Sequence, residues 1–216
     1  MFLPEDISLF IFSWKHVTQN AIALYHAIQP HFPNCTLINC DENVTLPAEI
    51  RHITLDDSYY YGGQFDTAVN HSPHNHILAC IVGDVNPNAN WLSIRNKMLQ
   101  ALNDESVGIY APDVDYTAHT QKGPLLTGSL YHVHNTDCTA WFLHPTVMKR
   151  LRTIPYRAIT NLGWGIDTIC IRESRKNGLH VVRDYSEKVL QPQGTNYDKP
   201  EAFRQMYALE AYYMRM

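Results

Sequence analysis

The sequence predicts an α/β protein with a mostly parallel central sheet flanked by helices. First, strand-like and helix-like patterns alternate along the first half of the chain, as expected when helices connect parallel strands. Second, residues 77–82 form an unbroken apolar run that ends at Gly83, which is typical of a strand buried on both faces. The chain has 216 residues, and this length favours a single domain over residues 1–216.

The first half of the chain supplies the alternating elements. Residues 7–14 are rich in β-branched and aromatic side chains and predict a strand. Residues 16–28 carry apolar side chains on one helical face, and Pro30 and Pro33 end that helix. Similar patterns predict strands at 35–40, 50–55 and 107–111, the first turns of a helix at 65–71, and a helix at 91–102.

The second half is predicted from shorter signals. A helical pattern at 167–177 is followed by Gly178, which suits the left-handed position after a helix end. The remaining predicted elements are strands at 125–133, 140–143 and 179–184, a short helix at 145–151, and a C-terminal helix at 199–216.

Composition limits the classes of function. The formal net charge is −4 and no cluster of Lys and Arg is present, so no nucleic-acid partner is expected. No segment approaches the roughly 20 apolar residues that a transmembrane helix needs, so no transmembrane segment is expected. The 5 cysteines include no Cys-x-x-Cys pair, which favours free thiols in a reducing compartment. We therefore expect a soluble, cytoplasmic protein.

The first candidate site directly follows the apolar run at 77–82. Asp84 and Asn86 come just beyond the carboxyl end of this predicted strand, where open α/β sheets bind their ligands. Carboxylate and amide oxygens suit a hard cation such as Mg²⁺ or Mn²⁺ and, through the cation, a phosphate. The structural alternative is that both side chains cap a turn or the start of the next helix.

The second candidate site is the segment Gly163-Trp164-Gly165, which is followed by Asp167. The two glycines permit unusual backbone angles around a large flat ring, and such a ring suits the face of a sugar. Asp167 then falls at the N-terminus of a predicted helix. It is either a general base beside this aromatic platform or a residue that caps the helix and interacts with its dipole.

The third candidate is Asp137, in a polar stretch that runs into an apolar segment containing Trp141. Asp137 could hydrogen-bond a polyol ligand or simply lie in a turn. Two pairs of histidines at i and i+2 would each share a strand face. Neither pair has a further ligand at a zinc-binding spacing, so no zinc site is predicted.

Taken in order, these segments resemble a glycosyltransferase of the GT-A fold, of the family-2-like kind. The resemblance rests on the strand at 7–13, the strand ending in Asp41, the strand running into Asp84-Val85-Asn86, Trp141, Gly163-Trp164-Gly165-Ile166-Asp167, and a tail at 189–197 that looks like a segment folding over the donor. It covers residues 5–198, and the order and spacing of the motifs carry it. Within this class the chain resembles the small GT-A domains in glycosyltransferases of large algal DNA viruses, which implies a virus-infected host cell.

The resemblance implies transfer of a hexose from a nucleotide-diphosphate sugar, with UDP as the expected nucleotide, to a hydroxyl group of a glycan or glycoprotein acceptor. It also implies inversion at the sugar carbon and a requirement for Mn²⁺ or Mg²⁺. The implied donor-binding residues are Ser13, Trp14, Asp41, Gln64 and Asp84. The remaining implied roles are metal binding by Asp84 and Asn86, acceptor binding by Trp141 and Trp164, and general-base catalysis by Asp167 or its rival Asp137.

The chain departs from the family pattern at three places. Asn86 replaces the second Asp of the metal motif, which leaves the metal to Asp84 and the diphosphate. The Glu-Asp pair of the family is reduced to Asp167 followed by Thr168, so the base could instead be Asp137. Gln191 replaces a histidine of the tail that often binds the metal.

These departures keep a second function open, a non-catalytic nucleotide-sugar or carbohydrate-binding module on the same fold. A third alternative, a nicotinamide-dependent oxidoreductase, is disfavoured because no Gly-x-Gly-x-x-Gly follows the first strand. Donor hydrolysis with Mn²⁺ present distinguishes the first two functions, since only an enzyme would release the nucleoside diphosphate.

Overall fold

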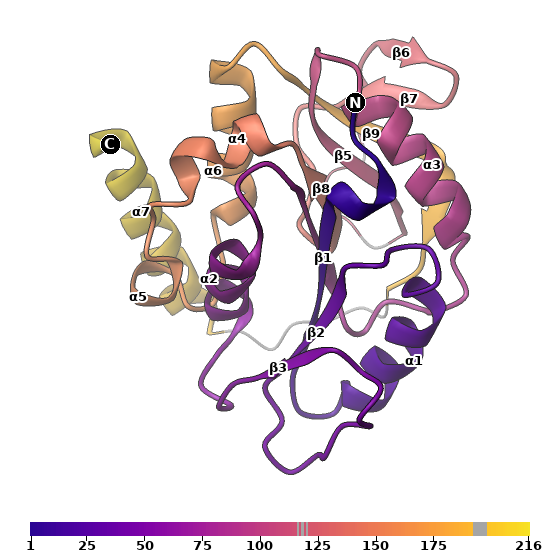
Figure 1. Cartoon of the computed structure of the whole chain (residues 1–216). Coiled ribbons are helices and arrows are strands. Elements are labelled where there is room, and N and C mark those ends of the chain that lie inside the picture. The colour runs from indigo at the N-terminus through magenta and orange to yellow at the C-terminus, as the bar shows by residue number, and fades with distance from the viewer. Residues whose placement is uncertain (116, 118, 120, 192–197) are drawn as a thin grey trace.

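The computed structural model describes residues 1–115, 117, 119, 121–191 and 198–216. Its centre is a nine-stranded sheet with the strand order β3-β2-β1-β4-β8-β5-β9-β7-β6 (Figure 1). The strands are β1 (Ile7–Ser13), β2 (Cys35–Asn39), β3 (His52–Thr54), β4 (Ile77–Val82), β5 (Val107–Val114), β6 (Leu125–Thr127), β7 (Leu130–His132), β8 (Ala140–Leu143) and β9 (His180–Val189).

Most strands of this sheet run in one direction. β1 pairs in parallel with both β2 and β4, β2 with β3, and β5 with β9. β8 and β7 run the opposite way: β8 lies antiparallel between β4 and β5, and β7 lies antiparallel between β9 and β6. The predicted α/β class with a mostly parallel sheet is therefore confirmed.

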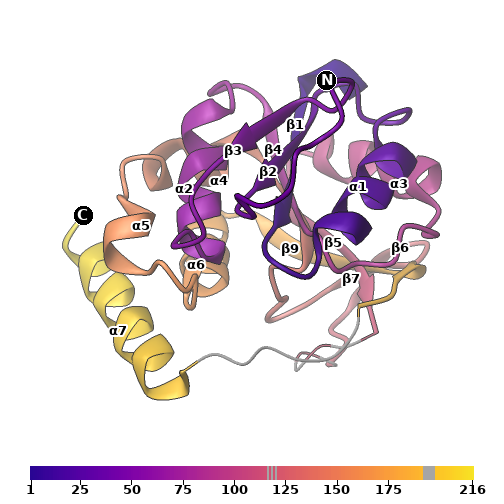
Figure 2. The same cartoon turned by 90° about the horizontal axis from the view of Figure 1, so that it is seen from below.

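Helices cover both faces of the sheet. They are α1 (Thr18–Ile28), α2 (Tyr61–His71), α3 (Trp91–Leu102), α4 (Pro145–Leu151), α5 (Tyr156–Ile159), α6 (Ile166–Lys176) and α7 (Lys199–Arg215), preceded by a 3₁₀ turn at Pro4–Asp6. α1 and α3 lie on one face, whereas α2, α4 and α6 lie on the other, with α5 and α7 packed outside them (Figure 1, Figure 2). No helix within the described ranges is long and apolar enough to cross a bilayer.

β4 lies inside the sheet, with both of its faces covered. All 6 of its residues are buried, and so are all 7 residues of the neighbouring β1. The two strands are aligned from Ile7 opposite Ile77 to Phe12 opposite Val82. The apolar run that predicted a buried strand is therefore part of the hydrophobic core, where burial of each large apolar side chain contributes roughly 1.5–3 kcal/mol.

The structure departs from the predicted elements where local signals are ambiguous. α2 begins at Tyr61 rather than near Phe65. Gly62 lies inside the helix, where a Cβ would lie 1.7 Å from the carbonyl oxygen of Thr160, so this glycine permits close packing and does not mark a loop. The strand predicted at 125–133 is instead the hairpin β6–β7. α5 has only 4 residues, too few for helical periodicity to be recognised.

Candidate active site

The turn after β4 places Asp84 at the carboxyl edge of the sheet. The N–H of Gly83 donates to the carbonyl of Phe12 at 2.7 Å, and a Cβ at this glycine would lie 2.6 Å from the same oxygen. A residue with a side chain would therefore clash with β1. The Asn20 side chain donates to the carbonyl oxygens of Gly83 and Val85, at 2.6 and 2.8 Å. α1 thus fixes the loop that carries Asp84.

Asp84 is connected to the residues after β9 and to those before β8. The Gln191 amide donates to both carboxylate oxygens of Asp84, at 3.2 and 3.4 Å. The side-chain carbonyl of Gln191 accepts from the Thr139 hydroxyl at 3.0 Å. Burial raises the pKa of Asp84, and the hydrogen bond from Gln191 offsets part of this effect. Three segments that are distant in sequence thus meet around one carboxylate.

The side chain of Asn86 is engaged by its own loop. Its oxygen accepts from the N–H of Asn88 at 2.9 Å, and its backbone N–H donates to the Leu190 carbonyl at 2.8 Å. This is the turn-capping arrangement named above as the alternative to metal binding. Among the residues that the structure describes, no group of three or more His, Cys, Asp or Glu side chains is placed to hold a metal ion.

Asp137 lies beside a buried arginine. One carboxylate oxygen is 3.8 Å from the guanidinium of Arg183 in β9, and the other accepts from the N–H of Thr139 at 3.3 Å. Arg183 is only 1% exposed and donates to the His119 carbonyl at 2.6 Å and to the Thr136 hydroxyl at 3.2 Å. A buried guanidinium requires such partners because an unpaired buried charge is costly. Arg183 thereby connects the segment containing Asp137 to β9.

Asp167 lies in the first turn of α6. The residue at the N-cap is Gly165, whose φ of +88° lies in the left-handed region that glycine adopts without strain. Burial raises the pKa of Asp167, the hydrogen bond from the Thr168 N–H at 2.8 Å and the charge of His119 lower it, and the charge of Asp137 raises it. Burial also raises the pKa of Cys138, and the charges of Asp167 and Asp137 add to this effect. The carboxylates of Asp137 and Asp167 are therefore near enough for their charges to interact.

Three predicted donor-binding residues gather where β1 and β2 end. Ser13 is fully buried, and its hydroxyl donates to the Thr18 hydroxyl at 3.4 Å. The Thr18 hydroxyl in turn donates to the Asp41 carboxylate at 3.4 Å. Trp14 follows Ser13 in the chain and is 36% exposed. Gln64, the fourth predicted residue, is buried in α2, where its amide donates to a backbone carbonyl at 3.4 Å.

The two tryptophans expected at the acceptor side differ in position. Trp141 lies in β8, is fully buried, and packs with its ring centroid 6.0 Å from that of Phe65. Its burial fits a core role, and the acceptor role predicted for it does not suit this position. Trp164 is partly buried in the loop before α6, with its ring centroid 5.1 Å from that of Phe203 in α7. Of the two, only Trp164 presents surface to a ligand.

Several residues in this region are not predicted from the sequence. Thr18 and Thr139 carry no sequence signal, because a single threonine near a strand end is ordinary. Arg183 does carry one: a charged residue inside an otherwise apolar predicted strand is rarely buried unless it is paired. Gln191 stands where the family pattern often has a metal-binding histidine, and the structure places its amide against Asp84.

The fold of this chain is similar to the folds of several solved structures. No protein-family model matches the chain, and no curated protein matches its sequence. Among solved structures, GalNAc-T7 with UDP, GalNAc and Mn²⁺ aligns over 88% of this chain, with a TM-score of 0.60 and 9% identity. A Bacillus anthracis protein assigned as a glucose-1-phosphate thymidylyltransferase, in complex with sucrose, aligns over 93% with a TM-score of 0.55 and 10% identity. UDP-glucose pyrophosphorylase from Acinetobacter baumanii aligns over 95% with a TM-score of 0.52 and 8% identity.

These similarities define the class of fold. The chain spans 44% of the GalNAc-T7 chain, 95% of the thymidylyltransferase and 93% of the pyrophosphorylase. At such low identity the likeness shows the fold alone, which is the GT-A-like fold of glycosyltransferases and nucleotidyltransferases. The predicted GT-A fold is thereby confirmed. A glycosyltransferase involved in glycosylation of the major capsid of PBCV-1 reaches a TM-score of only 0.34, so the viral likeness stays a prediction.

Proposed function

We propose that this protein is an inverting glycosyltransferase that moves a sugar from a nucleotide-diphosphate donor, with UDP as the expected nucleotide, to a hydroxyl acceptor. The observation that carries the proposal is the convergence of Asp84, Asp137 and Asp167 at one edge of a GT-A-like sheet. Gln191 and Thr139 connect the first two by hydrogen bonds, and the charge of Asp137 acts on Asp167. Sugar transfer needs a base for the acceptor proton and positive charge near the departing diphosphate, and carboxylates can serve as that base and as ligands of a cation that supplies the charge.

The donor diphosphate is assigned to the region of Asp84. The oxygen and nitrogen of the Gln191 amide exchange places by a half-turn, after which Asp84 and Gln191 offer two oxygen ligands. Mn²⁺ and Mg²⁺ commonly bind through one or two protein oxygens and complete their coordination with substrate phosphates. The residues present therefore fit a divalent cation at Asp84 and Gln191, while Asn86 caps its own turn. Such a cation would offset the negative charge that develops on the departing diphosphate.

The nucleoside is assigned to the ends of β1 and β2. The Asp41 carboxylate can accept hydrogen bonds from a base or a ribose hydroxyl, and Thr18 holds it in place. The partly exposed ring of Trp14 lies next to this group in the chain and can pack against a planar base. In this arrangement Ser13 supports the site through Thr18.

The acceptor hydroxyl is assigned to Asp167. As the acceptor oxygen forms its bond to the sugar carbon, the bond from that carbon to the diphosphate breaks, and its electron pair leaves with the diphosphate. Asp167 takes the proton of the acceptor hydroxyl. Because burial raises its pKa, it binds this proton more strongly than an exposed aspartate would. Asp137 is already engaged by Arg183 and by the Thr139 N–H, which makes it the weaker candidate.

Two contacts favour the alternative function, a binding module without catalysis. The carboxylate of Asp84 already has an amide donor from Gln191, and the side chain of Asn86 is bound within its loop. If these contacts persist when a donor binds, no metal enters and the diphosphate is not activated. The module would then bind a nucleotide sugar or a glycan and release no product.

Titration calorimetry with UDP, in the presence and absence of Mn²⁺, tests the donor end. We expect Mn²⁺ to tighten UDP binding to the wild type by about tenfold or more, and Asp84→Ala to abolish this gain. Asn86→Ala is the matched control and should retain it, whereas Gln191→Ala should reduce it. Equal UDP affinity in the wild type and Asp84→Ala, with and without the ion, would remove Asp84 from the metal site. UDP binding without hydrolysis of any UDP-sugar would favour the module.

A further inference from the structure

Two large aromatic side chains are exposed on α7. Phe203 is 43% exposed and Tyr207 is 63% exposed. They are one helical turn apart, so both lie on the same side of the helix. Their ring centroids are 6.5 Å apart and their planes differ by 26°. The two rings therefore form one continuous exposed aromatic surface, which is available to a ligand.

This surface continues to Trp164, at the acceptor side of the candidate active site. The ring centroid of Phe203 lies 5.1 Å from that of Trp164, with the planes at 73°. The loop that carries Trp164 is bonded to α7 through the N–H of Leu162, which donates to the Gln205 side chain at 2.9 Å. The N-terminal end of α7 lies towards the edge of the sheet at which β1, β2 and β4 end (Figure 1). The first turns of α7, which include Phe203, thus lie towards the same edge of the sheet as the candidate site.

The exposed rings are not what holds α7 in place. The opposite side of the helix is anchored by the buried Leu209 and Tyr213, and the Tyr213 hydroxyl donates to the Glu173 carboxylate at 2.8 Å. Gly165 also approaches the helix closely, since a Cβ there would lie 2.9 Å from Met206 Cγ. α7 can therefore keep its position when its exposed rings are removed, which makes those rings testable by substitution.

We propose that Trp164, Phe203 and Tyr207 form an aromatic track that binds an extended, neutral glycan acceptor. This inference rests on the proposed function. One face of a pyranose ring carries C–H groups that pack against the electron-rich face of an aromatic ring. Arg204, next to Phe203, donates to Glu201 at 2.6 and 2.7 Å, so its charge is compensated and does not attract an anionic ligand. The reacting sugar lies at the proposed base, and the following sugars lie along α7.

Binding of defined oligosaccharides measures the track directly. The probe is an array of neutral oligosaccharides of one to six units, applied to the protein without a donor so that no transfer can occur. We expect affinity to increase with the number of sugar units. Phe203→Ala and Tyr207→Ala should weaken binding of the longer oligosaccharides by about 3- to 10-fold each and leave monosaccharide binding unchanged. Binding that does not depend on length would overturn the track.

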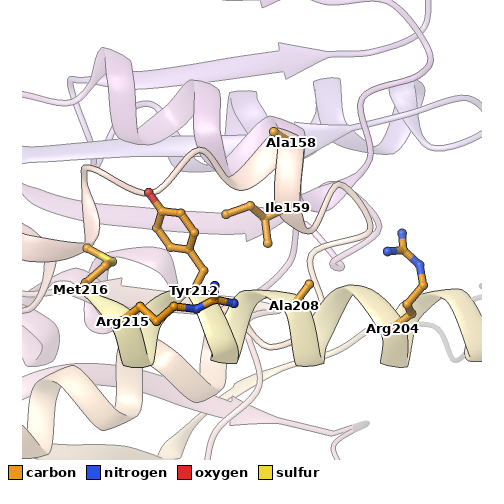
Figure 3. Close-up of a pocket in the computed structure, with 7 residues that line it drawn as sticks. All are labelled: Ala158, Ile159, Arg204, Ala208, Tyr212, Arg215 and Met216. Atoms are coloured by element: carbon orange, nitrogen blue, oxygen red, sulfur yellow. The ribbon is translucent and has the colours of Figure 1, made fainter.

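Tyr212 is the matched control on the same helix. It is partly exposed like Phe203, but it points towards α5 and lines a cavity of about 540 Å³ together with Ala158 and Ile159 (Figure 3). Tyr212→Ala should therefore leave oligosaccharide binding unchanged. Losses of equal size for Tyr212→Ala and Phe203→Ala would indicate a general disturbance of α7 and would overturn the assignment.

Failure of the track and failure of the proposed function have different signatures. If the wild type hydrolyses a UDP-sugar but binds no oligosaccharide of the array, the track is wrong and the proposed function stands. In another outcome, oligosaccharides bind, Phe203→Ala weakens their binding, and neither UDP binding nor UDP-sugar hydrolysis is detected. The track is then correct, and it belongs to a non-catalytic module. If light scattering finds a dimer that Phe203→Ala dissociates, the rings belong to an interface between two copies, and the track is wrong.

Discussion

Position 167 combines two properties that a structural residue seldom combines. Its carboxylate lies in the first turn of a helix, where the helix dipole favours a negative charge, yet burial raises its pKa. A second carboxylate, that of Asp137, adds to the rise. A raised pKa does not help an aspartate that only caps the helix, because capping uses the charged carboxylate. A raised pKa does help a general base, because it increases the affinity for the proton that the base must accept.

Replacing Asp167 by Asn should retain the shape of the side chain and remove the base. We expect sugar transfer to fall by roughly 10²–10⁴-fold, because general-base catalysis typically contributes that factor. UDP binding should stay at the wild-type level, since Asp84 and not Asp167 is assigned to the diphosphate. Initial transfer rates with saturating UDP-sugar, together with UDP titrations of the same preparations, provide the measurement.

Asp137→Asn is the internal control for this experiment. It should reduce transfer less than Asp167→Asn, although it removes a partner of the buried Arg183 and should lower stability. Near-normal transfer by Asp167→Asn combined with a large loss for Asp137→Asn would exchange the two roles. If both variants transfer at the wild-type rate, the acids are structural and the binding module becomes the better description.

At the scale of single elements, β9 shows how the fold delivers Gln191 to Asp84. The register between β5 and β9 shifts near the end of β5: Pro112 lies opposite Asp184, but the next residue, Asp113, lies opposite Lys188. The residues of β9 between Asp184 and Lys188 therefore form a bulge. Asp184 holds this bulge, because its fully buried carboxylate accepts from the hydroxyl and N–H of Ser186, at 2.7 and 3.0 Å. The strand resumes beyond the bulge and leads towards the site.

Asp184→Ala should destabilise the protein by about 2–3 kcal/mol at pH 7, because it leaves buried hydroxyl donors such as that of Tyr110 without an acceptor. Urea unfolding followed by tryptophan fluorescence measures this difference. Burial alone would raise the pKa of Asp184, but the hydrogen bonds from Ser129 and Ser186 outweigh it and the pKa is lowered. The stabilisation is therefore present above the ordinary aspartate pKa of about 3.9 and is lost as the pH falls through the lower folded value.

A difference between wild type and Asp184→Ala that stayed constant from pH 7 to pH 3 would contradict this account of the bulge. Ser129→Ala is the milder control, since it removes one hydroxyl donor to Asp184 at 2.5 Å and leaves the carboxylate in place. Its expected cost is about 1 kcal/mol.

For the molecule as a whole, one sheet and one core connect the two halves of the chain. In the part of the chain that the structure describes, buried apolar side chains from Ile7 to Tyr213 belong to a single cluster. We therefore expect residues 1–216 to unfold as one domain, in a single calorimetric transition whose van't Hoff and measured enthalpies agree. Two resolved transitions would divide the chain into separate domains.

A bound donor should raise the temperature of that single transition. At 100 times its dissociation constant a ligand adds about 2.7 kcal/mol to the free energy of unfolding. For a domain of this size, the midpoint should rise by roughly 5–10 °C with UDP and Mn²⁺. Asp84→Ala should reduce the shift, and a shift of equal size in this variant would place the ion elsewhere.

The sequence predicted the strongly patterned parts of this molecule best. The strand at Ile77–Val82 and the helix at Trp91–Leu102 have the bounds expected from their apolar patterns. The insertion of β8 between β4 and β5 could not be predicted, because strand pairing depends on contacts between distant segments. For the same reason Asp84, Asp137 and Asp167 were recognised singly, but the connection through Thr139 and Gln191 was not. Trp141 shows the opposite case. A tryptophan is a suitable residue for an acceptor site, but this one is fully buried and fills the core, which the sequence alone does not reveal.

The reversed direction of β8 has a consequence for how such a site can evolve. β5 ends at the carboxyl edge of the sheet, and the antiparallel β8 begins at that same edge. Between them in sequence the chain makes an excursion to the far end of the sheet, where the hairpin β6–β7 (Leu125–His132) pairs with β9. Natural insertions or a grafted loop in this excursion could alter what the protein recognises while the hydrogen-bond ladder from β4 through β8 to β5 stays unchanged. We therefore expect sequence differences among relatives to be concentrated in this excursion. Engineered changes of specificity are best made there for the same reason.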